Sequence, residues 1–377
     1  MLSFFNCVIY LLFGILVAGS LLPLSSHPHW FIRGWDFPRM QILVITWLAA
    51  AALITTNAIA GQPSTVRLTV IATLTLALTA WHLFRIIPYT PLSATQTKSW
   101  RPEQPGDPDH GARRLRVVIS NVEEENDQFD RWREVVLDQD PDVVIVAEVD
   151  QRWADVIDEM KPSYPNQIVY PQDNWYGMAL LSRLPILESE IRFRVQDDVP
   201  SIDTMIELPG GDQVRVVGVH PRPPEPIRDN DATARDAELV LWGEELADDD
   251  RPIIIGGDLN DVAWSQSTRL FLRLSRLLDP RRGRGFFNSF HADRMWMRFP
   301  LDHVFHSTHF AFRDLRRLPH VGSDHFPILI DLQLEPTMHH QHDQLEEKEG
   351  DEAEAVERLM RAKQAESLHV ETLNPAW

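Results

Sequence analysis

The chain has 377 residues, which is enough for one sizeable domain with additional segments. Its formal net charge is −19 at pH 7, and residues 113–335 alone carry about −15, which opposes non-specific binding to duplex nucleic acid. The only cysteine is Cys7, so an intramolecular disulfide framework is excluded.

Three apolar stretches without Asp, Glu, Lys or Arg occupy most of the first 90 residues. They are Phe4–Leu22, Met40–Ala60 and Leu68–Phe84, each 17–21 residues long, which is the length needed to cross a hydrocarbon core. A cleaved signal peptide is the alternative for the first stretch. Its start lacks basic residues and two further stretches follow, so we expect three retained transmembrane helices within residues 1–87. Aromatic residues expected at the membrane–water interface are Trp30, Trp35, Trp47, Trp81 and Tyr89.

Three spans place the two ends of the chain on opposite sides of the membrane. The loop after the first span contains Arg33 and Arg39, and the segment after the third contains further basic residues, whereas the other side has Arg67 and the amino terminus. The positive-inside rule therefore predicts a multi-pass protein of the cell (inner) membrane whose large C-terminal part lies in the cytoplasm.

Residues 88–112 are rich in Pro and Gly and are expected to link the membrane part to a domain over residues 113–335. Strands are predicted at 115–120, 143–147, 168–170, 178–182, 188–195, 204–208, 214–219, 253–255, 301–306, 311–315 and 326–332. Helices are predicted at 129–139, 153–160, 232–246 and 267–278. Mixed strands with interspersed helices over one core predict a two-sheet α+β or α/β sandwich.

The tail, residues 336–377, is polar and acidic. Residues 344–368 have the composition of a lone charged helix, and we expect a solvated or disordered extension. The tract containing His339, His340 and His342 is only weakly indicative of metal binding, because it has no partner scaffold.

Pro252–Asn260 is the most informative stretch of the domain. Three isoleucines predict a buried strand, and Gly256 and Gly257 permit a tight turn and the close approach of a ligand. Asp258 and Asn260 follow two residues apart, so their side chains share a direction if the extended conformation continues. A carboxylate and an amide at a strand end suit a phosphate, although both residues also favour ordinary turns.

Other apolar strands also end in, or are preceded by, polar residues fit for chemistry. Glu148 ends one apolar run and Asn121 ends another, and together they would form a binding site for a hard divalent cation. Glu148 would also suit the start of a helix. Asp302 lies in a third apolar strand and is a candidate to orient His325, which follows Asp324 just ahead of a fourth. His220 ends a fifth strand, where a lone histidine is usually only a polar stop.

Taken in order, these motifs resemble the endonuclease/exonuclease/phosphatase superfamily, which has the fold of deoxyribonuclease I, across about residues 114–335. The resemblance rests on Ile-Ser-Asn121-Val, Val-Ala-Glu148, Gly177–Pro185, Val-Gly-Val-His220, Gly-Gly-Asp258-Leu-Asn260, Leu-Asp302-His-Val-Phe and Ser-Asp324-His325-Phe-Pro. It implies a four-layered αββα sandwich, here preceded by three transmembrane helices, and a divalent metal, Mg²⁺ or Mn²⁺.

The resemblance also implies a role for each residue. Glu148, helped by Asn121 and with Asp324 completing the network, would bind the metal. Asp258 would orient or deprotonate the attacking water, and Asn260 would hold a phosphate oxygen. His325, oriented by Asp302, would hydrogen-bond the phosphoryl group, and His220 would assist the leaving group or the phosphate. Arg183, within the Gly177–Pro185 motif, is a candidate substrate contact.

Two features depart from the family pattern. Glu123, followed by two more glutamates, stands where several members have Asp, and its longer side chain would shift or add a metal contact. Dense basic loops that grip duplex DNA are missing, and Arg281-Arg282-Gly-Arg284 is either a contact for a phosphorylated substrate or a solvated loop. We therefore expect a membrane-anchored phosphoesterase acting on a lipid head group or small phosphoester, with a nuclease and a non-catalytic membrane module as alternatives.

Overall fold

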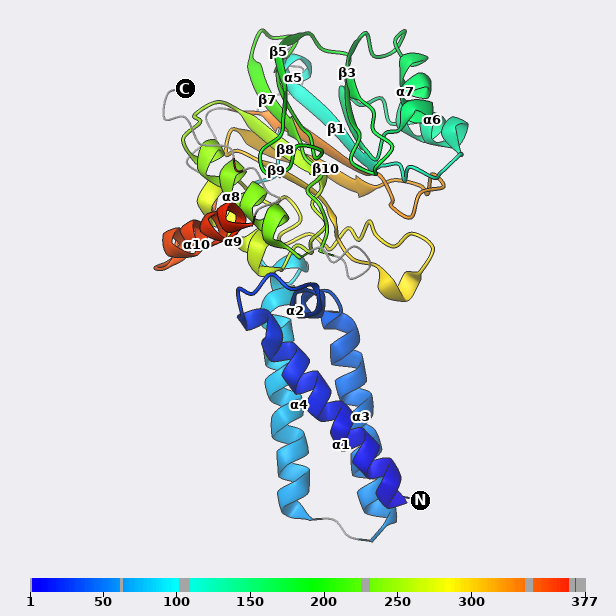
Figure 1. Ribbon diagram of the computed structural model, residues 1–377, viewed down its shortest axis with the longest axis vertical. Coiled ribbons are helices and arrows are strands. Elements are labelled where there is room, and N and C mark those ends of the chain that lie inside the picture. The colour runs from blue at the N-terminus through cyan, green and yellow to red at the C-terminus, as the bar shows by residue number, and fades with distance from the viewer. Residues whose placement is uncertain are drawn as a thin grey trace.

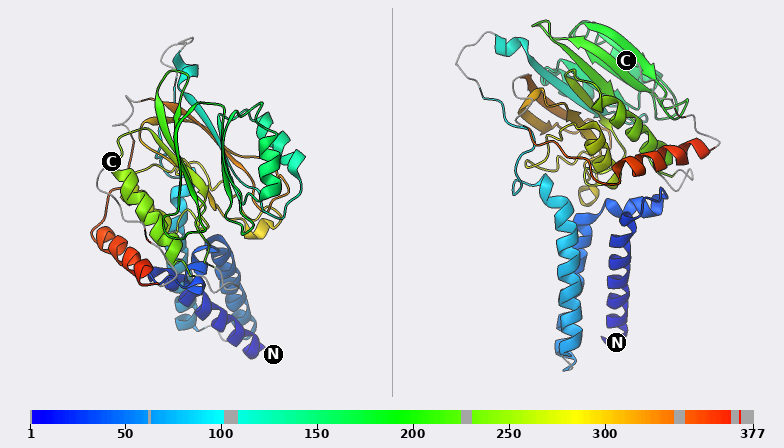
Figure 2. Two further views of the ribbon diagram at one scale, coloured as in Figure 1. Left: turned by 45° about the horizontal axis from the view of Figure 1, so that its top comes forward. Right: turned by 90° about the vertical axis from the view of Figure 1, so that its left-hand side faces the viewer.

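The computed structural model describes residues 2–61, 64–101, 109–224, 231–335, 342–365 and 370 (Figure 1). Three long helices project from one side of a β-sandwich, and the helix nearest the C-terminus lies against the sandwich close to them (Figures 1 and 2).

The long helices are α1 (Leu2–Leu21), α3 (Arg39–Ile59) and α4 (Thr65–Ile86). Their apolar stretches, Phe4–Leu24, Arg39–Ile59 and Thr65–Tyr89, are long and apolar enough to cross a membrane. Large apolar side chains such as Leu11, Leu48 and Phe84 are more than 60% exposed, which suits contact with lipid. Short helical segments connect α1 to α3: η1 (Leu22–Leu24), α2 (Trp30–Arg33) and η2 (Gly34–Asp36). A further turn, η3 (Ile87–Tyr89), follows α4.

Two mixed sheets form the sandwich. The first has the order β10 (Phe310–Arg317), β11 (Ile328–Leu334), β1 (Arg114–Asn121), β2 (Val143–Ala147), β4 (Met178–Ser182), β3 (Asn166–Tyr170). The second has the order β5 (Ile186–Arg192), β6 (Ser201–Glu207), β7 (Gln213–Gly218), β8 (Ile253–Asp258), β9 (Asp302–His306). Each sheet contains one parallel pair, β1 with β2 and β7 with β8.

Helices cover the outer face of each sheet. The helices α6 (Phe129–Asp138) and α7 (Gln151–Asp158) bury Trp132 and Trp153 against β1, β2 and β11. The helices α8 (Thr233–Ala247) and α9 (Gln266–Ser275) bury Trp242 and Phe271 against β7 and β8. A third apolar cluster lies between the sheets. The predicted four-layered α+β sandwich is therefore confirmed. The remaining short helices are α5 (Asp109–Ala112) and η4 (Met295–Met297).

Two predicted element boundaries are wrong. The strand expected at 188–195 runs over Ile186–Arg192, because β5 is an edge strand with four exposed residues and lacks the alternation that marks a half-buried strand. The helix expected to reach residue 278 ends at Ser275, because Arg276 adopts a left-handed conformation with φ of 57°.

The segment after α4 packs on the sandwich. Tyr89 is 1% exposed, and its hydroxyl donates to the carbonyl of Ala263 at 2.6 Å. The expectation that Tyr89 lies at the membrane interface is therefore wrong, because this ring fills an apolar cluster with Trp264 and Phe299 instead. Further along, the backbone of Trp100 donates to Phe312 of β10 at 2.7 Å. Residues 102–108 of the expected linker lie outside the described residues.

The described part of the tail contains a helix that packs on the domain, so it is neither a lone helix nor the solvated extension that we expected. The helix α10 (Asp351–Gln364) packs on α8 and α9, and Asp351 forms an ion pair with Arg273 at 2.6 Å. Ala355, Arg358 and Ala362 are buried along one stripe of α10, at the spacing of a packed helix face. His339 and His340 lie outside the described residues, whereas Nδ1 of His342 accepts from the backbone of Lys98 at 3.2 Å.

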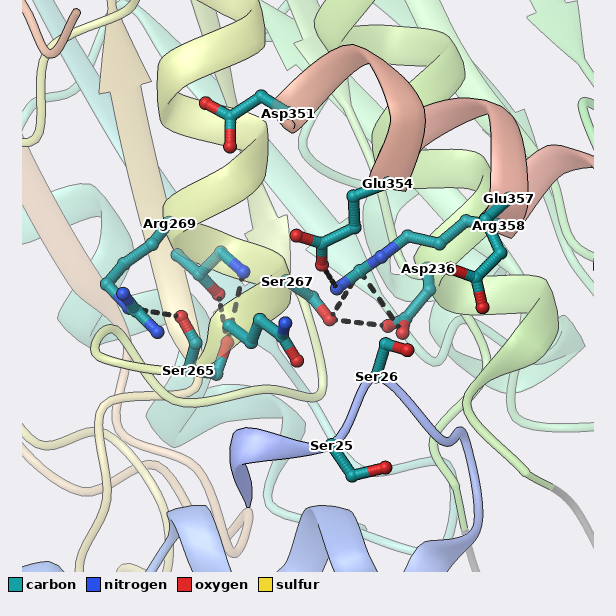
Figure 3. A network of polar contacts seen from close by, with 12 residues as sticks. Ser25, Ser26, Asp236, Ser265, Ser267, Arg269, Asp351, Glu354, Glu357 and Arg358 are labelled. Atoms are coloured by element: carbon teal, nitrogen blue, oxygen red, sulfur yellow. Dashed lines mark hydrogen bonds and ion pairs between the residues drawn. The ribbon is translucent and has the colours of Figure 1, made fainter. Parts of the chain in front are cut away.

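A buried ionic cluster joins the membrane-side loop to the domain. Asp236 of α8 lies 2.8 Å from Arg33 in α2. It also lies 3.2 Å from Arg358 in α10 and accepts from Ser267 of α9 at 2.7 Å (Figure 3). Burial by itself raises the pKa of Asp236, but Arg33, Arg358 and Arg235 outweigh burial and hold the pKa well below its usual value. The carboxylate therefore ties three separate parts of the chain together.

Replacing Asp236 with Ala removes the counter-ion that these arginines share and leaves the buried Arg33 without an acidic partner among the described residues. Arg358 keeps Glu354, and Arg235 keeps Asp261. We expect the free energy of unfolding to fall by about 3–5 kcal/mol. Because the folded-state pKa is lowered, this contribution is complete above pH about 4 and is lost only as the pH falls further. Denaturant unfolding of the detergent-solubilised chain measures the change. The matched control is Asp130→Ala, which removes a carboxylate that is 91% exposed and is expected to cost less than about 1 kcal/mol. Equal stability of the two variants would contradict the assignment.

Candidate active site

The polar residues at the strand ends meet at one end of the sandwich. In the first sheet, Asn121 pairs in register with Ala147, so Asn121 and Glu148 lie side by side. In the second sheet, Asp258 pairs with Asp302. Because the two sheets are stacked face to face, both pairs reach the same edge.

The two glycines of β8 leave room for neighbouring parts of the chain, Gly256 for the facing sheet and Gly257 for the segment that follows β7. A Cβ at Gly256 would collide with Ile119 of β1, and a Cβ at Gly257 would collide with the carbonyl of Val219. Gly257 also has a φ of 151°. We expected these glycines to make room for a ligand. That expectation is wrong, because the space is taken by the chain's own neighbouring strands.

Asn121 bridges the two sheets. Its Nδ2 donates to Oε1 of Glu148 at 2.7 Å and to Oδ2 of Asp258 at 3.1 Å. Its Oδ1 accepts from the backbone of Glu123 at 2.9 Å, which fixes the orientation of the amide. Burial raises the pKa of Glu148 to about 8 and also raises the pKa of Asp258. Two desolvated carboxyl groups are thus held within reach of one amide.

His325 lies between two carboxylates. Nδ1 is 2.7 Å from Oδ2 of Asp302, and Nε2 is 3.5 Å from Oδ2 of Asp258. Burial by itself lowers the pKa of His325, but the charges of Asp302 and Asp258 outweigh burial and hold the pKa well above its usual value. The imidazole is therefore protonated at neutral pH, with Nδ1 committed to Asp302 and Nε2 directed at Asp258.

Asp324 stands beside this imidazole, with Oδ1 at 3.8 Å from Nε2 of His325. Burial raises the pKa of Asp324 to about 6, and the charge of Glu123 adds to the rise. Glu123 accepts from the backbone of Asp324 at 2.8 Å through Oε2. The longer side chain at position 123 thus holds the segment that carries Asp324 and His325 in place.

His220 and Asn260 flank Asp258 on its other side. Nε2 of His220 is 3.9 Å from Oδ2 of Asp258, and its Nδ1 has no hydrogen-bond partner among the described residues. Burial lowers the pKa of His220 to about 4, so this ring is neutral at pH 7. Asn260 has a φ of 52°, so the extended conformation that we expected to continue past Asp258 does not. Asp258 accepts instead from the backbone of Asn260 at 2.8 Å, and Asn260 Nδ2 donates to the carbonyl of Pro221 at 3.1 Å.

Arg183 does not belong to this site, so its expected role in substrate binding is wrong. It follows β4, which runs antiparallel to β2, and Ser182 pairs with Val143 at the end of the sheet opposite Glu148. The Arg183 guanidinium forms an ion pair with Asp140 and lies 5.0 Å from the ring centre of Tyr164.

The arginine-rich segment 281–284 is neither a solvated loop nor a substrate contact at this site. Arg281 is 2% exposed and is paired with Asp279 at 2.7 Å and with Nδ1 of His303 at 2.7 Å. Arg284 stacks 3.7 Å from the ring centre of Phe312. Both guanidinium groups are therefore committed to the interior of the protein.

Several supporting residues were not predicted. Ser323 donates to the carbonyl of Asn121 at 2.9 Å and accepts from the backbone of His325 at 2.9 Å. Ser289 accepts from the backbone of Asp302 at 3.0 Å, and Arg235 donates to the carbonyl of Asn260 at 2.9 Å. The Phe290 ring centre is 4.9 Å from that of His325. These residues act mainly on backbone atoms that are distant in sequence, and the sequence pattern contains no signal for such contacts.

The site suits a divalent cation by the chemistry of its donors. Five acidic residues, Glu123, Glu148, Asp258, Asp302 and Asp324, converge with one charged imidazole. Asp258, Asp302 and His325 each offer an atom within 4.8 Å of the others. His325, however, is protonated and bound to Asp302, so it is a poor ligand. Glu148 with Asn121 is the better seat, because a hard cation prefers oxygen donors and would relieve the desolvation that raises the pKa of Glu148.

Replacing Asp302 with Asn removes the charge that sustains the protonated imidazole. We expect the pKa of His325 to fall, because burial then acts against a weaker opposing charge. Histidine ring signals followed by NMR across a pH titration measure the change. His306 in the same sample is the internal control, because neither Asp302 nor His325 is among the groups that shift its pKa. An unchanged pKa of His325 would show that the Asp302 contact does not set it.

Comparison with known proteins identifies the family of the chain. The sequence profile of the Endonuclease/Exonuclease/phosphatase family matches residues 118–325, more than half of the chain. No curated protein matches. Among solved structures, a family protein from Bacteroides thetaiotaomicron shows 19% identity and a TM-score of 0.49, covering 61% of this chain and 98% of that chain. Truncated Caenorhabditis elegans TDP2 shows 15% identity and a TM-score of 0.48, covering 60% of this chain and 99% of that chain. Sphingomyelinase C from Streptomyces griseocarneus shows 19% identity and a TM-score of 0.44, covering 59% of this chain and 99% of that chain. On the profile match, this chain belongs to the Endonuclease/Exonuclease/phosphatase family.

Proposed function

We propose that this protein is a membrane-anchored, divalent-metal-dependent phosphoesterase that hydrolyses a lipid head group or a small phosphoester by attack of water. The observation that carries the proposal is the continuous network from Glu148 through Asn121 and Asp258 to His325 and Asp302. This network brings a cation-binding site, a base and a charged hydrogen-bond donor together at one end of the sandwich. Phosphoryl transfer requires these three groups.

Glu148 and Asn121 would hold Mg²⁺ or Mn²⁺, with Asp324 completing the network. When bound, the cation would polarise a phosphoryl oxygen and offset its negative charge. Asn121 already joins Glu148 to Asp258 through one amide, so the seat and the base keep a fixed separation.

Asp258 would orient the attacking water and take its proton. Hydrogen bonds from Asn121 and from the backbone of Asn260 hold the carboxylate in one orientation. Its pKa is raised by burial, which makes the carboxylate a better base than one in water. The amide of Asn260 would hold a non-bridging phosphate oxygen beside it.

His325 would donate from Nε2 to the phosphoryl group as negative charge builds. Asp302 fixes Nδ1 and keeps the ring protonated, so the donor is in place before the reaction begins. His220 is neutral, and its unpartnered Nδ1 suits a hydrogen bond to the leaving group or to a phosphate oxygen.

The membrane assignment is supported by the three apolar helices and by charge placement. The loop with Arg33 and the domain with Asp236 touch, so they would lie on the same side of a bilayer. That is the arrangement the positive-inside rule favours, with the catalytic domain on the cytoplasmic face of the inner membrane.

Isosteric changes at the base and at the donor test the chemistry. We expect Asp258→Asn and His325→Gln each to lower turnover of a phosphodiester with Mg²⁺ about 10²–10⁴-fold, since each removes one proton-transfer or charge-stabilising group. Initial rates of the purified full chain measure the loss. Arg183→Ala, at the far end of the sheet, is the control and is expected to retain activity. Full activity in either test variant would refute the assignment.

Metal affinity is expected to rise with pH. Because the pKa of Glu148 is raised to about 8, a cation must displace a proton below that pH, and affinity falls by up to about tenfold per unit as the pH drops. Glu148→Gln should weaken binding and flatten the pH dependence, whereas Glu159→Gln, whose side chain is 66% exposed, should change neither. Calorimetry with Mn²⁺ from pH 6 to pH 9 measures both. Absence of Mn²⁺ and Mg²⁺ binding would favour a non-catalytic membrane module.

A substrate panel separates the remaining classes. We expect phospholipids or inositol phosphates to be hydrolysed faster than plasmid DNA or RNA, because the domain carries a net charge of about −15 that repels nucleic acid. The hydrolysis rate of each substrate, measured at one physiological salt concentration, distinguishes a lipid or small-phosphoester hydrolase from a nuclease. Strong nicking of plasmid DNA under those conditions would replace the lipid assignment with a nuclease.

A further inference from the structure

A hairpin over residues 289–299 connects the site to the membrane side of the protein. Its two arms are paired by backbone hydrogen bonds, including Phe290 to Phe299 at 3.0 Å and His291 to Met297 at 3.1 Å. The helical turn η4, Met295–Met297, forms its tip. In Figure 1 this segment, in yellow, hangs from the sandwich on the side of the long helices.

The base of the hairpin lies on the catalytic residues. The backbone of Ala292 donates to the carbonyl of Asp324 at 2.6 Å, and the Phe290 ring lies against His325. Ser289 accepts from the backbone of Asp302. A displacement of the hairpin would therefore move the groups that orient the imidazole.

The tip carries the largest exposed apolar side chains of the described sandwich. Met295 is 79% exposed and Trp296 is 70% exposed, with the exposed Arg294 beside them. An aromatic ring next to a basic residue is the composition that favours the interfacial layer of a bilayer. In water, the exposed apolar surface of Met295 and Trp296 would be energetically unfavourable.

The tip is also fixed at the level where the second apolar helix begins. Gln41, in the first turn of α3, donates to the carbonyl of Trp296 at 2.7 Å. Phe37, which precedes α3, packs edge-on against Phe299 with ring centres 5.5 Å apart. The apolar stretch of α3 begins at Arg39, so Trp296 lies level with the start of the segment that would cross the membrane.

We propose that the hairpin 289–299 is a second membrane contact, in which Met295 and Trp296 enter the interfacial layer of the bilayer crossed by the three helices and direct the site toward lipid head groups in it. Met295 lies five positions after Phe290, so the catalytic imidazole lies within about 20 Å of the inserted tip. This inference rests on the proposed function, and it narrows the substrate to the phosphoesters of membrane lipids.

Depth of insertion is tested without reference to activity. The chain has one cysteine, so a Cys7→Ser background permits a single fluorescent label at Trp296→Cys in the full chain. In vesicles of equal parts phosphatidylcholine and phosphatidylglycerol, we expect acyl-brominated lipid to quench this label and aqueous iodide not to. The matched control is Asp130→Cys on α6, at a side chain that is 91% exposed, where iodide alone should quench.

Two results would overturn the contact. Quenching of the label at 296 by iodide, as at 130, would show a tip in water. Shielding from both quenchers would show a protein surface, such as a second copy of this chain, in place of lipid.

An activity ratio tests the substrate class. In the Met295→Ser/Trp296→Ser variant we expect turnover of vesicle phospholipid, relative to turnover of soluble bis(p-nitrophenyl) phosphate, to fall about tenfold, with recovery in Trp296→Phe. An unchanged ratio would overturn the lipid assignment. If the wild-type chain hydrolyses neither substrate, the proposed function fails, whereas the depth measurement still decides whether the hairpin contacts the bilayer.

Discussion

The close approach of β8 to β1 is the constraint on which the site depends. Gly256 removes the side chain that would hold β8 away from Ile119 of β1, and the amide of Asn121 can then reach Asp258 across the gap at 3.1 Å. With the sheets in contact, each strand-end residue falls within hydrogen-bond or ion-pair distance of another. A larger residue at Gly256 would push β8 away from β1 and separate Glu148 from Asp258, even if each sheet kept its own hydrogen bonds.

The same convergence concentrates negative charge in a place that water reaches poorly. Burial raises the pKa of Glu148, Asp258 and Asp324, and the one strong counter-charge is His325. Such an arrangement costs folding free energy, which the large apolar clusters on both faces of each sheet must offset. In the proposed function, the chemical benefit would be an affinity for a cation and a carboxylate able to accept a proton.

Two different junctions hold the apolar helices to the catalytic domain. One is ionic, with Asp236 between Arg33 and Arg358, and Arg235 next to Asp236 donates to the carbonyl of Asn260. The other is apolar and contains Phe37, Tyr89 and Phe299. Both junctions end on segments that carry site residues. The orientation of the site relative to the long helices is therefore built into the packing of the protein rather than left to a flexible connection.

The sequence by itself determined the local features: the three apolar helices, most strands to within a few residues, and the identity of the polar residues at strand ends. These features follow from composition and periodicity over short stretches of sequence, so they can be predicted without knowledge of the tertiary structure. The tertiary structure alone decided which strand ends share an edge. It placed Arg183 at the end of the sheet opposite Glu148, because β4 runs antiparallel to β2. It also packed α10 on the domain through Ala355 and Ala362, where we expected a solvated segment. It also placed Gly256 at the contact between the two sheets and Gly257 against the backbone of Val219. Strand direction and packing partners are set by contacts between residues far apart in the chain, and such contacts leave no trace in a local pattern.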